Sequence, residues 1–332
     1  MNPVAALEPM RALSQAQTAD IRQALLGPGL LLDVGLAMLR VQGDAPALAQ
    51  QLQAVYRHFP FSVAPGWADV HLHIQRRRGL RRWLRPQVVF RCDSDEPFDP
   101  FPADTALPLM EWGANYLIGR RFNDSLLFHA GVVERDGHAL LMPALPGSGK
   151  STLTAALSLR GWRMLSDEFG ALDLQRGSFR PVLKPVALKN TSIDVIRAFA
   201  PEAELGPEFP RTRKGRVAHL APSGPAVAAR HTHAWPGAVL LPRWRPSGGT
   251  RLEPVPPQLV FPTLAFNAFN YAVLGAEGFR AAVSLAQACP TWQLEYSDLH
   301  DAINHLEREW PAVVLQATAR RAGESRHEEA MP

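Results

Sequence analysis

The stretch Ala144-Leu-Pro-Gly-Ser-Gly-Lys-Ser-Thr152 constrains the fold of this chain more than any other part of the sequence. An apolar run at 139–142 precedes it, and helix-forming residues at 153–159 follow it. A strand, a glycine-rich loop and a helix in this order are the context of a P-loop, which binds the phosphates of a nucleotide. We therefore expect an α/β fold with a nucleoside triphosphate site.

Each residue type in this loop suits phosphate binding. Gly147 and Gly149 can adopt positive φ angles, which bring backbone N–H groups close to phosphate oxygens. Lys150 would reach the β- and γ-phosphates, and the Ser151 hydroxyl would hold Mg²⁺ at the helix N-terminus. The strict pattern has glycine where this chain has Ala144, a change that asks only for a more ordinary backbone. The expected nucleotide site is Pro146, Gly147, Ser148, Gly149, Lys150, Ser151 and Thr152.

Two further segments place functional groups beside the loop. The strand expected at 161–165 ends in Asp167 and Glu168, and a parallel α/β sheet has its site at such strand ends. Asp167 could support Mg²⁺ or act as the general base toward an acceptor hydroxyl; the alternative is a turn or helix-capping aspartate. His129 lies on a strand at 126–133 that a hairpin turn at 136–137 joins to the strand leading into the loop.

Composition excludes several other classes of protein. The chain has 332 residues, of which 46% are hydrophobic and 20% charged, so it can bury a large core. No apolar run approaches the ~18–20 residues of a membrane helix, and no signal-peptide pattern is evident, so we expect the protein to be in the cytoplasm.

The cysteines and histidines do not indicate a metal site. Cys92 and Cys289 cannot form a disulfide framework or a cysteine metal site. Two histidine pairs, 71/73 and 231/233, lack further ligands and are interpreted as surface or packing residues.

Two basic clusters, 76–85 and 211–216, are open to two interpretations. Either could bind an acidic peptide or phosphate, and the second could stabilise charge during phosphoryl transfer. Either could equally be a solvated surface. We do not expect nucleic acid as a partner, because no nucleic-acid motif accompanies them.

The motifs together resemble a known group of enzymes. His129-Ala-Gly131, the P-loop and Gly161-Trp-Arg-Met-Leu-Ser-Asp167-Glu168 resemble the HPr kinase/phosphorylase superfamily of bacterial P-loop serine kinases. Further blocks are similar to the HprK-related kinase A family associated with exosortase and PEP-CTERM gene clusters. These blocks cover 83–90, 188–196, 214–219, 269–279 and 295–299.

The resemblance implies a P-loop kinase core similar to HPr kinase and phosphoenolpyruvate carboxykinase, with ATP and Mg²⁺ as cofactors and a serine hydroxyl as acceptor. It implies that Lys150, Ser151 and Thr152 hold nucleotide and metal, and that Asp167 is the catalytic carboxylate. Asp167 and Glu168 would join Ser151 as metal ligands, and His129 would assist near the transferred phosphoryl group, so the implied catalytic set is Asp167, His129 and Lys150. Glu168 stands where HPr kinases have a second aspartate.

The acidic, proline-rich segment 93–108 indicates a linker. We therefore expect a smaller N-terminal α+β region at 1–105, the kinase domain at 106–316 and a disordered tail at 317–332. The expected helices are one starting after Asp44 and those at 109–118, 192–199, 258–274, 278–288 and 298–309. The segment 30–41 is expected to form one or two strands, and the remaining expected strands lie at 68–74, 87–90, 236–241 and 291–296.

The leading hypothesis is an ATP-dependent serine kinase whose acceptor is a protein or peptide. Assembly of this kinase into a homo-oligomer is compatible with the hypothesis. One alternative is a kinase of small hydroxylated molecules, and another is a regulatory module that senses ATP without transferring phosphate. Acceptor size separates the first two: a protein acceptor predicts an open, basic rim, whereas a metabolite predicts an enclosed pocket.

Overall fold

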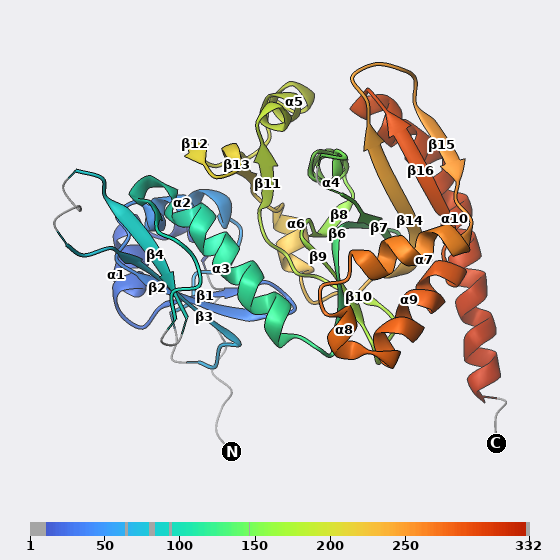
Figure 1. Ribbon diagram of the computed structural model, residues 1–332, viewed down its shortest axis with the longest axis horizontal. Helices are drawn as coiled ribbons and strands as arrows, with labels where there is room; N and C mark the ends of the chain where they lie inside the picture. Colours follow the sequence, from blue (N-terminus) through green and yellow to red (C-terminus); the bar gives the residue numbers. More distant parts are fainter. Residues whose placement is uncertain (1–10, 64–65, 80–83, 93–94, 146, 330–332) are drawn as a thin grey trace.

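The computed structural model describes residues 11–63, 66–79, 84–92, 95–145 and 147–329, with side chains up to 322. These residues form an α/β fold in which helices pack on three β-sheets (Figure 1). The expected α/β class is thus confirmed. None of the helices in the described ranges is both long and apolar enough to cross a lipid bilayer.

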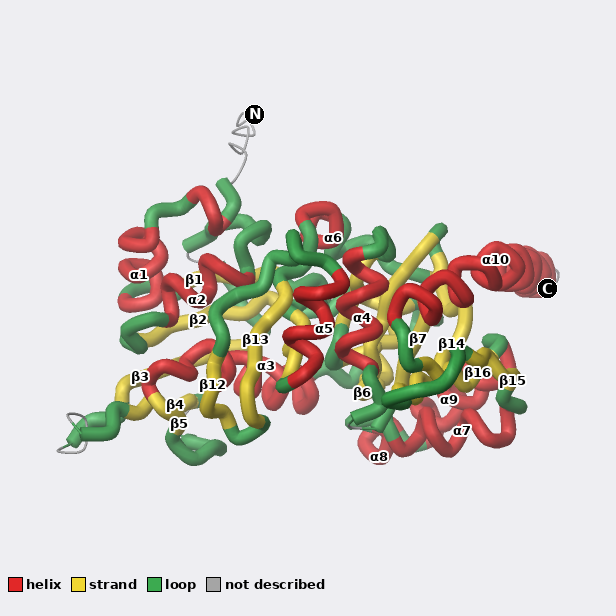
Figure 2. Tube along the Cα trace, turned by 90° about the horizontal axis from the view of Figure 1, so that it is seen from above, coloured by secondary structure: helices red, strands yellow, loops and turns green. Residues whose placement is uncertain are grey.

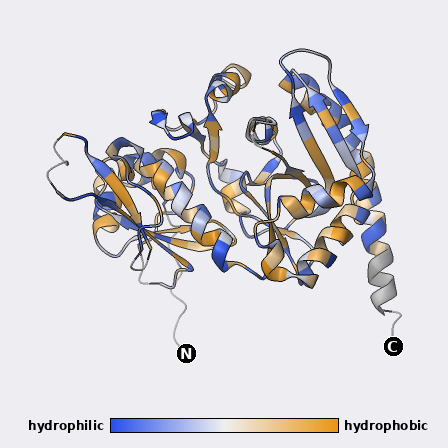
Figure 3. Cartoon of the chain, in the orientation of Figure 1, coloured by the Kyte–Doolittle hydropathy of each residue, from blue (hydrophilic) through white to orange (hydrophobic). Residues whose placement is uncertain are grey.

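The N-terminal region is built on a five-stranded sheet in the order β1-β2-β3-β4-β5. Alternation of buried and exposed residues along β3 places one face of this sheet against helices, and hydrophobic residues line its strands (Figure 3). The strands are β1 (Leu30–Asp33), β2 (Met38–Gly43), β3 (Val70–Arg76), β4 (Gln87–Arg91) and β5 (Phe101–Pro102). The helices are η1 (Leu13–Gln15), α1 (Thr18–Leu26), α2 (Leu48–Val55), η3 (Ala103–Thr105) and α3 (Ala106–Arg121).

Helix α3 connects the two regions of the chain. It packs against β3, β4 and α2, so the first helix of the expected kinase domain covers the N-terminal sheet. One continuous core of buried hydrophobic residues includes side chains from both regions. The boundary near residue 105 stays a prediction, and the two regions share a packed interface.

The central sheet has the strand order β10-β9-β6-β7-β14-β16-β15, with β8 paired to β6. Its strands are β6 (Ser125–Arg135), β7 (His138–Pro143), β8 (Arg163–Ser166), β9 (Phe169–Asp173), β10 (Phe179–Arg180), β14 (Trp235–Trp244), β15 (Arg251–Pro254) and β16 (Thr291–Tyr296). β6 is antiparallel to β7, β8 and β9, whereas β14 is parallel to β7 and β16. The expected hairpin at 126–142 and the strands at 161–165, 236–241 and 291–296 are confirmed.

Helices cover both faces of the central sheet (Figure 2). The helix after the glycine-rich loop is α4 (Lys150–Leu159), and its neighbour is α5 (Thr191–Phe199). The others are α6 (Gly224–Ala228), α7 (Pro257–Phe266), α8 (Tyr271–Leu274) and α9 (Ala276–Ala288). A three-stranded sheet in the order β11-β13-β12 lies between α5 and the N-terminal region; its strands are β11 (Val186–Lys189), β12 (Phe209–Thr212) and β13 (Gly215–Leu220).

The expectation of a disordered tail from 317 is wrong for the residues that the structure describes, because α10 runs from Leu299 to Glu329. Ala317 is buried, the Arg320 guanidinium donates to the Pro236 carbonyl, and the Arg321 guanidinium lies 3.5 Å from the ring centroid of Trp235. The charged composition of the segment does not indicate these contacts, because the apolar stems of arginines can pack on a surface while their charged ends stay in water.

Candidate functional site

The carboxyl ends of four strands meet around the glycine-rich loop. β14 and β16 run parallel to β7, and β8 has the same direction because both β7 and β8 are antiparallel to β6. The loop follows β7, and Asp167 follows β8. Both therefore lie at the sheet edge where α/β folds bind their ligands.

The loop has the backbone geometry that its glycines predict. Gly147 and Gly149 have φ angles of 86° and 91°. A Cβ on Gly149 would lie 2.4 Å from the Tyr296 hydroxyl, which donates to the Gly149 carbonyl at 3.3 Å. The backbone N–H of Trp244 donates to the Ser148 carbonyl at 2.9 Å. The strands β14 and β16 thus hold the loop from one side, through Trp244 and Tyr296, which the sequence analysis did not identify.

The loop retains hydrogen-bonding capacity that would suit phosphate. The first N–H groups of α4 point out of the helix N-terminus, as in every helix, and favour an anion. The hydroxyl of Ser148 is buried and has no hydrogen-bond partner among the described residues. The expected residue Pro146 lies outside the described residues.

Lys150 and Asp167 form the centre of the site. Both side chains are buried, and the Lys150 ammonium donates to Asp167 Oδ1 at 2.8 Å and also to the Asp167 backbone carbonyl. Such a pair carries a large desolvation cost, so it is weak evidence for stability. Phosphate oxygens are alternative partners for the ammonium group, which would leave the carboxylate for an acceptor hydroxyl.

His129 and Glu168 lie next to this pair. His129 Nε2 is 3.8 Å from Glu168 Oε1, and the backbone N–H of His129 donates to the Asn267 carbonyl at 2.6 Å. Burial lowers the pKa of His129, and the positive charge of Lys150 adds to this effect, while Glu168 opposes it. Burial raises the pKa of Glu168, but the charges of Lys150, His129 and two further lysines outweigh burial and lower it overall. Near pH 7 the imidazole is neutral and the carboxylate is ionised.

The donor set expected for Mg²⁺ consists of one hydroxyl and two carboxylates. Ser151 and Thr152, in the first turn of α4, are partly exposed, and Asp167 contacts Lys150 at the start of the same turn. Oxygen donors of this kind are those that Mg²⁺ prefers, together with phosphate and water. No cluster of three or more His, Cys, Asp or Glu side chains with metal-binding geometry occurs in the described part of the chain.

A cavity of about 480 Å³ opens beside the acidic pair. Its walls come from α3, β11, β13 and the segment between β8 and β9, so both regions of the chain contribute. Ser166, Asp167 and Glu168 are among the residues that line the cavity. A second cavity of about 170 Å³ lies between the loop and the segment 266–269 and includes His129.

A buried ion pair forms one wall of the larger cavity. Lys184 Nζ lies 3.0 Å from Glu111 Oε2 and also donates to the Asn115 side chain. The Tyr56 hydroxyl donates to Glu111 Oε1 at 2.7 Å, and burial raises the pKa of this hydroxyl well above its usual value. Sequence reasoning missed Glu111 and Lys184; the available signal was a charged residue inside an apolar run, as at Val182-Leu-Lys-Pro-Val186.

The structure separates the two basic clusters. Thr212 and Lys214, from the cluster 211–216, line the cavity. The cluster 76–85 begins at the end of β3, away from α4 in both views, and its residues 80–83 lie outside the described part (Figures 1 and 2). In the histidine pairs, His231 contacts Asp33 at 2.8 Å and His233 contacts the Ser178 hydroxyl at 2.9 Å.

No model of a known protein family matches the chain. A search of curated proteins also finds no match. The resemblance to the HPr kinase/phosphorylase superfamily therefore stays a prediction from the sequence motifs.

Proposed function

We propose that this chain is an ATP-dependent phosphotransferase with a P-loop kinase core of the HPr kinase type, which transfers the γ-phosphoryl group of ATP to an acceptor hydroxyl. The observation that supports it best is the position of Asp167. Its carboxylate touches Lys150 of the glycine-rich loop on one side and lines the cavity of about 480 Å³ on the other. A donor in the loop and an acceptor in the cavity would both reach it.

In the proposed reaction the acceptor oxygen attacks the γ-phosphorus, the bond from the γ-phosphorus to the bridging oxygen breaks, and ADP leaves. The Asp167 carboxylate accepts the hydroxyl proton. Lys150 and the N–H groups at the start of α4 stabilise negative charge on the phosphates. When bound by Ser151, Asp167 and Glu168, Mg²⁺ would neutralise part of this charge. Neutral His129, beside Glu168, is placed to donate a hydrogen bond to the transferred group.

The sequence predicts a serine of a protein or peptide as acceptor, with a small molecule as the alternative. The volume of the cavity favours the alternative, because about 480 Å³ lies within the range of many small-molecule sites, about 300–1,000 Å³. The third hypothesis, an ATP sensor without transfer, needs only the loop and leaves the carboxylate beside Lys150 without a role.

The test uses ATP labelled at the γ-phosphate, Mg²⁺ and a cell extract, with the wild-type chain and Asp167→Asn. We expect Asp167→Asn to bind ATP within a few-fold of wild type while transfer falls by about 10²–10⁴. Asp136→Asn is the matched control: it makes the same change at an exposed turn with φ of 55°, which asparagine tolerates, between β6 and β7. Unchanged transfer by Asp167→Asn refutes the base assignment, and ATP binding without any labelled acceptor favours the sensor.

A further inference from the structure

The larger cavity has more room than a protein side chain would need. A serine presented by a protein would deliver only a hydroxymethyl group to Asp167. The cavity instead offers about 480 Å³ and a wall of aromatic rings. Phe98 and Phe101 each contact Trp112 edge to face, with ring centroids 6.2 Å and 5.3 Å apart, so this wall offers an aromatic surface to a whole small molecule.

Two lysines of the cavity form no ion pair within the described part of the chain. Lys189, at the end of β11, and Lys214, in the turn between β12 and β13, form no ion pair with any carboxylate in the described ranges. The Lys214 ammonium instead lies 4.8 Å from the ring centroid of Trp112. Partial burial lowers the pKa of Lys214, and the nearby charge of Lys189 lowers it further. An anion between the two ammonium groups would relieve this repulsion.

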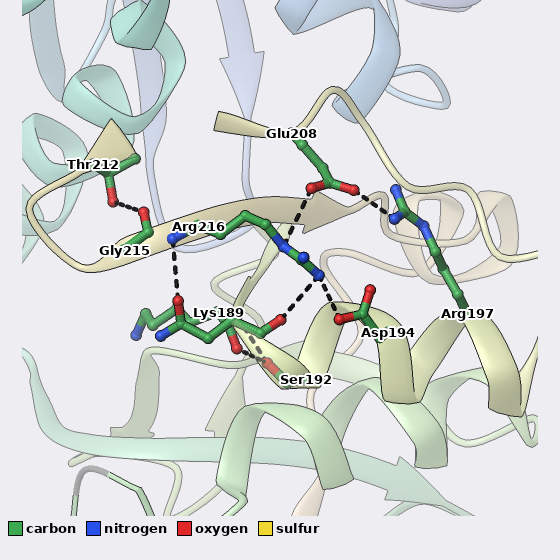
Figure 4. Close-up of polar contacts among 9 residues, drawn as sticks. Lys189, Ser192, Asp194, Arg197, Glu208, Thr212, Gly215 and Arg216 are labelled. Carbon is green, nitrogen blue, oxygen red and sulfur yellow. Dashed lines mark hydrogen bonds and ion pairs between the residues drawn. The ribbon is translucent and has the colours of Figure 1, made fainter. Parts of the chain in front are cut away.

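A network of ion pairs around Arg216 lies next to Lys189 (Figure 4). Arg216 pairs with Asp194 at 2.5 Å and with Glu208 at 3.3 Å, and Glu208 also pairs with Arg197. The Asn190 side chain accepts the Arg216 N–H at 3.1 Å. The carboxylates of Asp194 and Glu208, near the β12–β13 hairpin, are therefore bound to arginines. They leave the ammonium groups of Lys189 and Lys214 free to bind an anion.

A buried histidine supplies the second independent sign of a ligand. His219, on β13, lines the cavity and is 2% exposed, and its Nδ1 has no hydrogen-bond partner among the residues that the structure describes. Buried polar atoms almost always have a partner, and an exception in a cavity indicates a group that a ligand would satisfy. Burial lowers the pKa of His219 to about 4, so the ring is neutral and offers one donor and one acceptor.

We propose that this cavity is the acceptor site, and that it takes a small hydroxylated compound whose carboxylate or phosphate group lies between Lys189 and Lys214. The acceptor hydroxyl faces Asp167, and the rest of the molecule packs against Trp112. This inference rests on the proposed function, since it names the substrate class of the same site. It replaces the protein or peptide acceptor that the sequence favours.

The first experiment identifies the acceptor class. The chain is incubated with ATP labelled at the γ-phosphate and Mg²⁺, together with either the small-molecule filtrate or the protein fraction of a cell extract. Labelled products are identified by mass spectrometry. We expect label in a filtrate compound that is already anionic before phosphorylation; glycerate and glycerol 3-phosphate, tested separately, distinguish carboxylate from phosphate recognition, and glycerol is the neutral comparison.

The second experiment uses the identified acceptor with Lys189→Gln and Lys214→Gln. Loss of one charge-assisted contact should raise the acceptor KM by roughly tenfold to a hundredfold in each variant, with the KM for ATP unchanged. Arg211→Gln is the matched control, because Arg211 is exposed on the same hairpin and does not line the cavity. It should leave both constants unchanged.

The outcomes separate this inference from the proposed function. Label found only in the protein fraction, or in a neutral filtrate compound, overturns the inference and leaves phosphoryl transfer supported. Unchanged acceptor KM in both lysine variants overturns the placement of the anion. Absence of label in both fractions while ATP still binds overturns the proposed function, and the inference falls with it.

Discussion

Protonation of His219 should destabilise the folded chain in acid. Burial lowers the pKa of this ring to about 4 in the folded state, against 6.5 for an ordinary histidine. The unfolded chain therefore binds the proton more readily, and the free energy of unfolding must fall as the pH drops from about 6.5 to about 4. The two pKa values differ by about 2.5 units at about 1.4 kcal/mol each, so the full loss is about 3.5 kcal/mol, of which about 3 kcal/mol is reached at pH 4, where the folded ring is half protonated.

The variant His219→Gln removes this titration and keeps a polar side chain. Urea unfolding at pH 7, 6, 5 and 4 measures the free energy of unfolding of both proteins. Other groups titrate in the same range, so the informative quantity is the difference between variant and wild type at each pH. We expect that difference to move in favour of the variant by about 3 kcal/mol between pH 7 and pH 4. His71→Gln, on an exposed position of β3, is the matched control. A difference that stays constant with pH would refute the assignment of a buried, neutral ring.

Three further predictions test other parts of the structure. Gly149→Ala should lower ATP affinity by about tenfold or more, measured by calorimetric titration, because φ is 91° and the new Cβ would meet the Tyr296 hydroxyl. Glu111→Gln should lower the free energy of unfolding in urea by about 3–5 kcal/mol, because it leaves the buried Lys184 without its anionic partner. Deletion of 317–332 should lower the same quantity by about 1–2 kcal/mol, because it removes the contacts of Arg320 and Arg321; a disordered tail would give no change.

The sequence predicted the elements whose patterns are local. The apolar runs at 126–133 and 138–142 with a turn between them became β6 and β7, and the loop at 144–152 leads into α4. β8 is antiparallel to β6, so its carboxyl end lies at the same edge of the sheet as the glycine-rich loop. Asp167, which follows β8, is therefore close to the loop. Periodicity and turn residues suffice for such features because they depend on neighbours in the chain.

The cavity could not be predicted in the same way. Glu111 and Lys184 are 73 positions apart in the chain, and nothing in either segment indicates their contact. The sequence analysis predicts no strand at 209–220, whereas in the structure β12 and β13 pair with each other and β13 also pairs with β11. Pairing between distant strands overrides local preference in such segments.

The distribution of lysine argues that the cavity is a site and not a packing defect. Among 35 Lys and Arg residues the chain has only four lysines, Lys150, Lys184, Lys189 and Lys214. Lys150 pairs with Asp167, and the other three line the cavity, so every lysine of the chain lies at this one place. A lysine ammonium is a compact, flexible point charge, whereas the guanidinium is a wide planar group. With Asp167 and Glu111 each bound to one lysine, Glu168 is the remaining carboxylate opposite two lysines. This surplus of positive charge is what an anionic acceptor beside the phosphates of ATP would require.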